Sequence, residues 1–433
     1  MVAGAGLAGH EVVRRLLADP AFDGTITWHA GEPGHPYNRV LLTDLLAGRH
    51  APKAIELPTL RDPRLTYETR QLRNIAGAEF DHLVLATGAE PVIPPVRGNA
   101  VALRTLADVR TILAELDGDF DGRMPGGARG GSGSGAGPAG RKNSESSRGG
   151  SSGMAQIGRG LLSGFGNRRH GGNRRVAVIG GGPLGVETAC ALASRGVRVE
   201  LVHRGPHLLS RWLDAESGAL LAGSLTEAGI VVHCDTDVSA ATGIWPTADL
   251  VILACGVQPR VALARAAGLP IGAGILVDTS GRSLGDERIF AVGDCAETIG
   301  VGAAGGALAA LDGARRAVAA IGGALVLPSL PAVSPLRLRL RTYDIPGADV
   351  AVLGRPRAEA SIQFTDQRRR TRKVLALDGD VPVAAALVGD VTAAAALALA
   401  IARPTAPAPL SPAALLASPV LASPVLTSPL LTS

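Results

Sequence analysis

A glycine spacing that occurs twice is the feature that most constrains what this chain of 433 residues can fold into. In the spacing G-x-G-x-x-G, the first glycine permits a tight turn after a strand and the second lets the backbone approach a pyrophosphate. The third lets the following helix pack on the strand. The repeat therefore predicts two strand–turn–helix units, each able to hold a dinucleotide at a helix N-terminus. The two sets are Gly4, Gly6 and Gly9, and Gly180, Gly182 and Gly185.

The two copies differ in the strand that leads into them. A full strand, Val176 to Ile179, precedes the second turn, whereas only Met1, Val2 and Ala3 precede the first. By itself the first copy is a weak signal in a chain rich in alanine and glycine, and a chance run of small residues is the alternative. A central strand this short is expected to leave ladder groups of its neighbours unpaired, so we expect the natural chain to start a few residues upstream.

Charged residues follow the second strand of each unit. Glu32 lies just past "TITWH", 23 residues after Gly9, where a ribose-binding carboxylate belongs, although a solvated turn acid would look the same. In the second unit the strand "VRVELVH" ends at His203, and Arg204 follows. A cation there suits the 2′-phosphate of NADP, and a surface charge is the alternative.

Composition separates two segments from the folded part. Residues 117–174 are rich in glycine and serine, which is typical of a flexible linker, and we expect that they can be removed. They hold nine basic and four acidic residues, a difference of +5 that equals the whole net charge, so the rest of the chain is neutral. Nucleic-acid binding by the folded part is therefore not expected. Residues 403–433 repeat a serine–proline unit and are expected to be a disordered tail.

The cysteines exclude several kinds of redox centre. Cys190, Cys234, Cys255 and Cys295 are too far apart for a sequence-local metal site, an iron–sulfur cluster or a CxxC pair. Scattered cysteines fit a reducing compartment. No signal peptide and no long apolar run stand out, so the expected location is the cytoplasm, without a membrane partner.

Further motifs occur in a fixed order and carry a resemblance. They are "HPYNRVLLTDLLAG", "FDHLVLATGAEPVIPPVRG", "VAVIGGGPLGVETACALASRGVRVELVH", "HLLSRWLD", "ADLVILACGVQPR" and "RIFAVGDCAE". Together they resemble the FAD-dependent pyridine nucleotide oxidoreductases. The nearest likeness is to the flavoprotein part of the assimilatory nitrite reductase large subunit and to electron-transfer flavoproteins of nitrate assimilation. Rubredoxin and ferredoxin reductases come next.

The resemblance implies an α/β fold. It has two Rossmann-like dinucleotide-binding domains of the three-layer ββα type and a small α+β C-terminal domain. The expected domains are an FAD-binding domain at 1–116 and 257–327, an NAD(P)-binding domain at 175–256 and the small domain at 328–402.

One set of residues is implied to surround FAD. The first glycine turn would hold the pyrophosphate, and the turn "ATG" would lie beside the flavin. Asp294, in "VGDCA", would bind the ribityl chain, although a helix N-cap is an alternative role. The set is Gly4, Gly6, Gly9, Glu32 at the adenosine ribose, Arg39 near the phosphates, Thr87, Gly88 and Asp294.

A second set is implied to bind NAD(P)H. Glu187, on the helix after the second turn, would sit where the nicotinamide meets the flavin, and it is the candidate catalytic residue. An ordinary helix acid is the alternative. The resembling enzymes carry a histidine near position 203 with either nicotinamide, so NADH and NADPH both stay open. The set is Gly180, Gly182, Gly185, His203, Arg204 and Gly256, and no metal site is expected.

Several residues that are usual in the family are absent here, which makes some of the family's mechanisms unexpected for this chain. No cysteine precedes Cys190, so a thiol mechanism is not expected. The lysine that ferredoxin reductases place after "YxRPxLS" is absent, and Asp44 stands in that neighbourhood. The aromatic residue and the glutamine usual after "GDCA" are absent too.

We therefore expect an enzyme that passes electrons from NAD(P)H through FAD to a separate redox partner protein, in nitrate or nitrite assimilation, as a monomer or homodimer. The alternatives are a rubredoxin or ferredoxin reductase, and a degenerate nucleotide-binding protein without turnover.

Overall fold

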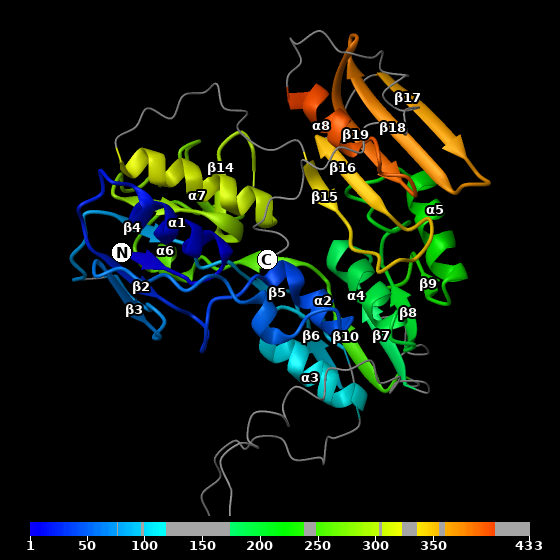
Figure 1. Cartoon of the computed structure of the whole chain (residues 1–433), viewed down its shortest axis with the longest axis horizontal. Coiled ribbons are helices and arrows are strands. Elements are labelled where there is room, and N and C mark those ends of the chain that lie inside the picture. The colour runs from blue at the N-terminus through cyan, green and yellow to red at the C-terminus, as the bar shows by residue number, and fades with distance from the viewer. Residues whose placement is uncertain are drawn as a thin grey trace, which may run out of the picture.

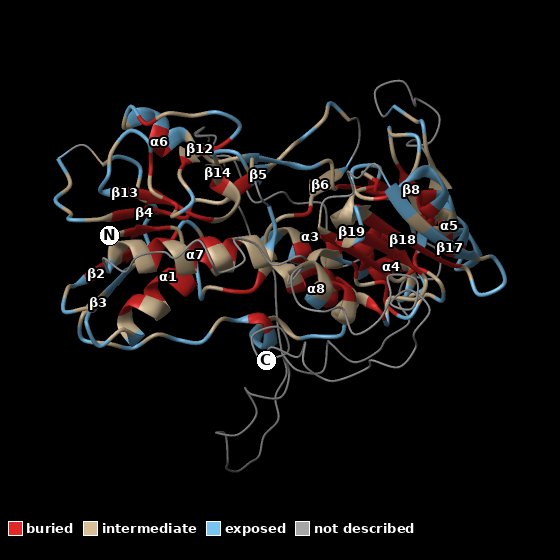
Figure 2. Ribbon diagram, turned by 90° about the horizontal axis from the view of Figure 1, so that it is seen from above, coloured by how far each residue is buried: buried red, intermediate tan, exposed pale blue. Residues whose placement is uncertain are grey.

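The protein consists of three units, which the ribbon in Figure 1 shows side by side. The computed structural model describes residues 1–75, 77–96, 99–117, 174–237, 248–302, 305–322, 336–354 and 360–402. The stretches expected to be a linker and a tail therefore lie outside the described residues, apart from the ends of the linker at 117 and 174. In Figure 2, buried residues concentrate in the strands and on the helix faces turned toward them.

The first unit is built on a five-stranded parallel sheet with the order β13-β4-β1-β2-β3. Helices α1 and α7 cover one face around Val12 and Phe290, and α6 with the β12–β14 pair covers the other. The elements are β1 (Val2–Ala3), α1 (Leu7–Ala18), β2 (Ile26–His29), β3 (Leu65–Glu68), β4 (Leu83–Leu85), α6 (Ala262–Ala266), β12 (Ile275–Val277), β13 (Ile289–Ala291), β14 (Ala296–Thr298) and α7 (Ala307–Ile321).

The two-residue strand β1 stands at the centre of this sheet. The N–H groups of Val84 and Ala86 donate to the carbonyls of Met1 and Ala3, at 2.9 and 2.8 Å. The expected gap in the ladder is therefore not found on the β4 side. Strand β4 is itself only three residues long, so a short partner is enough to pair it.

The second unit repeats this plan with a parallel sheet of order β6-β10-β7-β8-β9. Its first strand and helix come from residues 100–117, of which 100–116 were expected in the first domain. The boundary expected at residue 116 thus lies before β6, because β6 pairs with β10. The elements are β6 (Ala100–Ala102), α3 (Leu106–Asp117), β7 (Arg175–Ile179), α4 (Pro183–Ala193), β8 (Arg198–Val202), α5 (Ala215–Glu227), β9 (Val231–His233) and β10 (Leu250–Leu253).

Two connections link the first unit to the second. The antiparallel ribbon of β5 (Ala89–Pro91) and β11 (Val257–Pro259) carries the chain out of the first unit and back. Helix α2 (Leu42–Leu46) belongs to the first segment of the chain but packs against α4. Its Leu45 and Leu46 are fully buried in the core of the second unit.

The third unit is a five-stranded antiparallel sheet with one helix, which confirms the expected small α+β domain. The strand order is β15-β16-β19-β18-β17. One face packs on α8 around Leu353 and Leu387, and the other joins the core of the second unit through Val352 and Val388. The elements are β15 (Leu336–Arg339), β16 (Val350–Gly354), β17 (Ala360–Asp366), β18 (Thr371–Asp378), β19 (Val381–Val388) and α8 (Ala394–Ala402).

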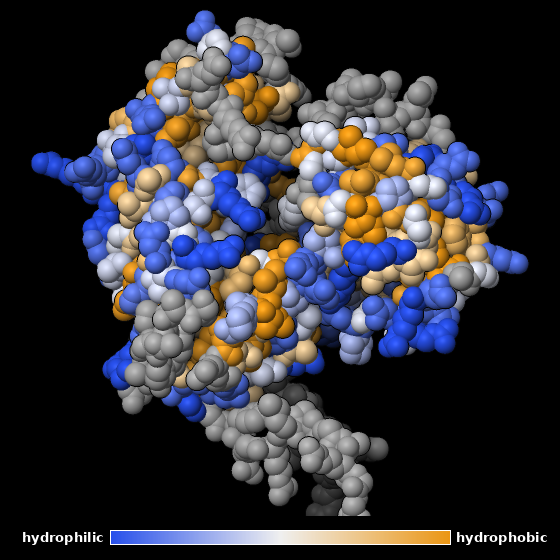
Figure 3. Space-filling model, turned by 180° about the vertical axis from the view of Figure 1, so that it is seen from behind, coloured by the Kyte–Doolittle hydropathy of each residue, from blue (hydrophilic) through white to orange (hydrophobic). Residues whose placement is uncertain are grey.

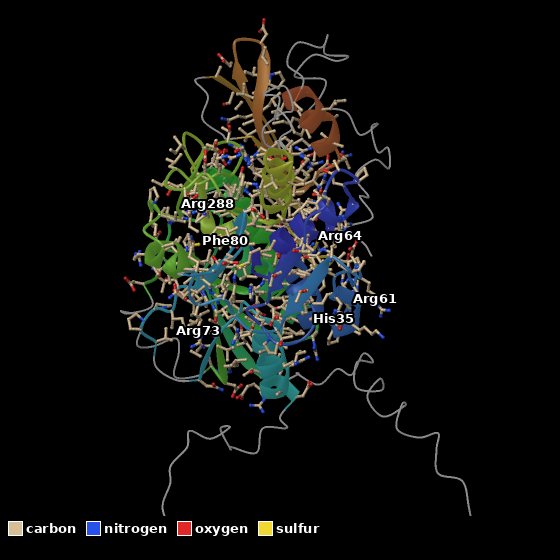
Figure 4. All side chains as sticks on the ribbon, turned by 90° about the vertical axis from the view of Figure 1, so that its left-hand side faces the viewer. His35, Arg61, Arg64, Arg73, Phe80 and Arg288 are labelled. Atoms are coloured by element: carbon tan, nitrogen blue, oxygen red, sulfur yellow. The ribbon has the colours of Figure 1, made fainter. Side chains whose placement is uncertain are left out.

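A space-filling view and a view with the side chains as sticks complete the description. Seen from behind, the surface is hollowed between the first unit and the other two (Figure 3). Figure 4 looks onto the outer end of the first unit, with Arg288 near Phe80 at one edge and Arg61 and Arg64 at the opposite edge. The Arg288 guanidinium lies 5.5 Å from the centre of the Phe80 ring. No helix of the described residues is long and apolar enough to span a membrane.

Candidate functional site

The first glycine turn joins β1 to α1 and has no room for side chains at two of its three glycines. Gly4 has φ +119°, and a Cβ there would lie 2.1 Å from the Ala86 carbonyl oxygen. A Cβ on Gly9 would lie 2.0 Å from the Gly4 oxygen. Gly6 is the N-cap of α1, and a Cβ there would have nothing within 4 Å. The open space in front of Gly6 adjoins the free N–H groups and the positive end of the helix dipole, an environment that favours anionic groups such as phosphate.

The second turn, between β7 and α4, repeats this geometry. Gly180 has φ +117°, and its Cβ would lie 2.3 Å from the Ala254 oxygen. A Cβ on Gly185 would lie 1.7 Å from the Gly180 oxygen, while Gly182, the N-cap of α4, is open. Both turns lie at the end of a strand that has neighbours on either side, which is where open α/β sheets bind their ligands.

Beyond β2, the predicted ribose acid and phosphate-side arginine meet. Glu32 forms an ion pair with Arg39, and the Tyr37 hydroxyl donates to Glu32 Oε2 at 2.6 Å. Burial raises the pKa of Tyr37 to about 12, so its hydroxyl stays a donor. The Arg39 guanidinium also donates to the carbonyl of Arg104 at 3.2 Å. Glu32 is thus held in a network and is not a freely solvated turn acid.

Asp294 is reached by an arginine that sequence reasoning missed. Arg104 Nη2 donates to Asp294 Oδ2 at 2.6 Å, and both side chains are about one-fifth exposed. Gly293, next to Asp294, packs against α1, since a Cβ there would lie 3.1 Å from the Ala8 side chain. Asp294 therefore lies beside the first turn, and contacts run without a break from Glu32 through Arg39 and Arg104 to Asp294.

A signal for Arg104 was present in the sequence. The Thr105 and Asp108 side chains form a reciprocal cap at the start of α3: Asp108 accepts from the Thr105 N–H at 2.6 Å, and Thr105 accepts from the Asp108 N–H at 3.2 Å. This pattern marks a helix start after β6, so the preceding Arg104 lies where strand ends meet. What remained hidden was its partner, 190 residues away.

Thr87 and Gly88 lie where the chain leaves the first unit. The Thr87 hydroxyl donates to the Arg260 carbonyl at 2.8 Å, and the Arg260 N–H donates to the Gly88 carbonyl at 2.9 Å. Gly88 has φ +69° and Gly256 has φ +100°, so both take a left-handed backbone at the two ends of the β5–β11 ribbon. These residues shape the crossing between the two sheets, with open space where a side chain would stand.

His203 lies under the second glycine turn. Its Nδ1 accepts from the Gly181 N–H at 3.1 Å, and a Cβ on Gly181 would lie 2.6 Å from its ring. Burial lowers the pKa of His203, so the ring is neutral and carries its proton on Nε2, which is buried with no partner among the described residues. Arg204 is exposed next to it.

Glu187 lies on α4, two residues after Gly185 of the second turn, where helix α2 and the third unit contact that helix. It is 9% exposed on α4, and its Oε1 accepts from the backbone N–H of Arg341, just after β15, at 3.0 Å. Helix α2 presents Thr43 and Asp44 to the same junction. Burial raises the pKa of Glu187 to about 7. The residues predicted for FAD therefore lie at the first sheet and those predicted for NAD(P)H at the second. Glu187 lies on α4 of the second unit, and its predicted place beside the cofactors stays a prediction.

Comparisons with known proteins agree with this arrangement. A family model described as pyridine nucleotide-disulphide oxidoreductase matches residues 1–323. A nitrite reductase [NAD(P)H] of Bacillus subtilis is 26% identical over 333 residues, which are 70% of this chain and 34% of the relative. The assimilatory nitrate reductase electron transfer subunit of the same organism is 25% identical over 329 residues, 69% of this chain and 36% of that protein. The chain spans about a third of the length of these relatives.

A solved structure shares the fold over nearly the whole chain. The covalent putidaredoxin reductase–putidaredoxin complex aligns with a TM-score of 0.67, covering 89% of this chain and 88% of that chain at 22% identity. This likeness supports the architecture of two parallel sheets and a small third unit.

Proposed function

Since its residues 1–323 match the family model, the chain belongs to the pyridine nucleotide-disulphide oxidoreductases, whose cofactors are FAD and NAD(P)H, and we propose that it is an electron-transfer reductase. The observation that carries the proposal is the pair of equivalent glycine turns, each with an open helix N-terminus at the end of a central strand. Bound FAD supplies the chemistry of accepting hydride and releasing electrons singly or in pairs.

The residues around the first turn fit FAD. Gly6 leaves the N-terminus of α1 open to the pyrophosphate, and Arg39 brings a positive charge to the same edge of the sheet. Glu32 would take the adenosine ribose, in exchange for part of its contact with Tyr37 or Arg39. Asp294, fixed by Arg104, would hold the ribityl hydroxyls. Thr87 and Gly88 would border the flavin ring.

The residues around the second turn fit a nicotinamide dinucleotide. Gly182 leaves the N-terminus of α4 open, and His203 supports the turn from below through Gly181. Arg204 is the exposed cation that would meet a 2′-phosphate, so NADPH as well as NADH is a reasonable donor. Gly256 would let the backbone of the crossing approach the cofactor.

We propose that no disulfide takes part in the electron route. All four cysteines are among the described residues, and all are free. Cys190 is fully buried, and burial raises the pKa of its thiol to about 12. Cys295 is also buried with a raised pKa. Since the thiolate is the reactive form, neither is suited to act as a nucleophile or redox relay.

The proposed acceptor is a separate redox protein of nitrate or nitrite assimilation. The similarity to a nitrite reductase and to a nitrate reductase electron transfer subunit supports this choice. A ferredoxin or rubredoxin as acceptor is the second candidate. It is favoured by the length match to the ferredoxin reductase component of a chlorobenzene dioxygenase from Cupriavidus sp., of which this chain covers 66%, against about a third of the nitrite reductases.

Anaerobic reduction of the purified protein by NADH and by NADPH, in parallel, tests the proposal. The protein should be yellow and should bleach with at least one donor, after which purified acceptors are screened for reoxidation. Protein that is colourless and takes up no added FAD would refute it. Nicotinamide binding without bleaching would instead favour a nucleotide-binding protein without turnover.

A further inference from the structure

Arg341, which the sequence did not single out, lies in the third unit and contacts helix α2, the residues just before it, and helix α4. It follows β15 of the third unit, beyond the residues matched by the family model. Its Nε lies 3.2 Å from Asp44 Oδ2 on α2, and its Nη1 donates to the Val40 carbonyl at 3.3 Å. Its backbone N–H donates to Glu187 on α4, and its Nη1 lies 3.9 Å from the same carboxylate.

The two carboxylates at this point are buried together. Glu187 is 9% and Asp44 6% exposed, and they come from different segments of the chain. Two carboxylates that share a low-dielectric site repel each other, and each is costly to bury without a partner. Arg341 is the cation that both of them contact among the described residues.

The backbone after Arg341 is held in an unusual conformation. Tyr343 and Asp344 have φ values of +52° and +67°, in the left-handed region that non-glycine residues rarely adopt. Such strain persists only where surrounding contacts enforce it, and it gathers at functional positions. Just before this turn the Arg341 N–H donates to Glu187, and within the turn Tyr343 is buried beside Thr43.

We propose that Arg341 is a positioning residue by which the third unit sets the ionisation and orientation of Glu187, against Asp44, where helix α2 packs against α4 of the second unit. The third unit then contributes a residue that acts on the candidate catalytic side chain, Glu187. The consequence for electron transfer rests on the proposed function, but the counter-ion role of Arg341 does not.

Other charged groups near the pair must be considered in any pH experiment. Cys190 faces Glu187 from its own helix and Tyr343 from the third unit, and burial raises the pKa of both. A cavity of about 650 Å³ borders Asp44 and Arg341, so protons can reach the junction from solvent. The further charged or titratable side chains that line that cavity are Arg49, His50, Asp344 and Asp349, and Arg49 forms an ion pair with Asp344.

The test compares Arg341→Gln with Arg341→Lys and with Arg339→Gln. Arg339 is exposed on β15, two residues away, and serves as the matched control. Thermal and urea midpoints of the purified full chain are measured from pH 5 to pH 9. Loss of an opposite charge at this distance should raise the pKa of Glu187 further, by about one to three pH units.

Arg341→Gln should therefore lose stability more at pH 8.5 than at pH 5.5, Arg341→Lys should recover most of the loss, and Arg339→Gln should resemble the wild type. In the double variant with Glu187→Gln and Arg341→Gln, the pH-dependent part of this stability loss should disappear. A loss that is equal at both pH values, or no loss, would overturn the proposal. If Arg341→Gln does not fold, the double variant decides, since its failure to fold would also overturn it.

A second readout concerns the redox reaction. In Arg341→Gln the midpoint of the pH dependence of NAD(P)H-driven bleaching should move upward, whichever form of Glu187 is active. If the midpoint does not move, the position of Glu187 has no effect on the redox reaction, and that part of the proposal is wrong. If even the wild type fails to bleach, the proposed function fails while the stability measurements still decide the role of Arg341.

Discussion

A methyl group added at Gly182 or at Gly185 should separate the binding role of the second turn from its structural role. At Gly182 the backbone has φ −80°, which alanine adopts freely, and a Cβ would have nothing within 4 Å. At Gly185 the same methyl group would lie 1.7 Å from the Gly180 oxygen, which belongs to the backbone and cannot rotate away. Gly182→Ala should thus fold, and Gly185→Ala should push α4 off β7.

The magnitudes follow from these two environments. As an N-cap, alanine is worse than glycine by about 0.5–1 kcal/mol, so Gly182→Ala should change the unfolding free energy little. Its methyl group would stand where a phosphate approaches the helix N-terminus. Losing one hydrogen bond to a charged group costs about 1.5–3 kcal/mol, or roughly a 10- to 150-fold weaker Kd. Gly185→Ala should cost at least the ~1–3 kcal/mol typical of overpacking.

The assay pairs nicotinamide binding with stability. NADH and NADPH are titrated anaerobically into each variant by calorimetry, and urea unfolding is followed in parallel. Gly6→Ala, at the equivalent position of the first turn, is the matched control: it should spare nicotinamide affinity and lower the flavin content instead. Wild-type nicotinamide affinity in Gly182→Ala, or equal destabilisation by Gly182→Ala and Gly185→Ala, would refute the assignment of the second turn.

Three further predictions concern buried polar groups. Burial raises the pKa of Glu187 from its ordinary 4.5 to about 7, so its contribution to stability is full below pH 4.5 and is lost as the pH rises to 7. At 1.36 kcal/mol per pH unit, the stability lost over this range is about 3 kcal/mol. Glu187→Gln should therefore unfold at a higher urea concentration than the wild type at pH 8, and at the same urea concentration at pH 4.5. Arg104→Gln and Asp294→Asn should each lower the flavin retained through purification, and the double variant should lose no more than the worse single one, since either change breaks the same 2.6 Å bond; additive losses would contradict this. Trp28→Phe removes the 3.0 Å bond from the Trp28 indole to the Gly4 carbonyl and should lower the unfolding free energy by about 1 kcal/mol, measured in urea; an unchanged value would show that the bond adds nothing.

The sequence was sufficient for the parts of the fold that depend on local sterics. Gly4 and Gly180 must be glycine because their φ values are near +118° and backbone oxygen lies about 2 Å from any Cβ, and this requirement is what the spacing reveals. The strands after the turns and the small third unit were predicted for the same reason, since their apolar patterns are local.

Partners distant in the sequence could not be predicted. Strand β6 joins the second sheet because β10 has a free edge there, and no local feature of residues 100–102 states this. Arg104 and Arg341 find Asp294 and Glu187 across 190 and 154 positions. A sequence pattern predicts that a residue lies on a helix, but it does not predict which group that side chain contacts. The expected position of Glu187 beside the cofactors therefore stays a prediction.

One hydrophobic core serves more than one of the three units. Leu45 and Leu46 from the first segment, Leu192 and Ile252 from the second unit and Val352 from the third unit belong to a single buried cluster, while the first sheet has clusters of its own. Elements that share a core lose their stability together. The second and third units should therefore unfold as one cooperative block that also anchors α2, with the first unit as the other. Calorimetry should then show two unfolding transitions for the three architectural units. A destabilising mutation in β16 should lower the stability of the second glycine turn more than that of the first.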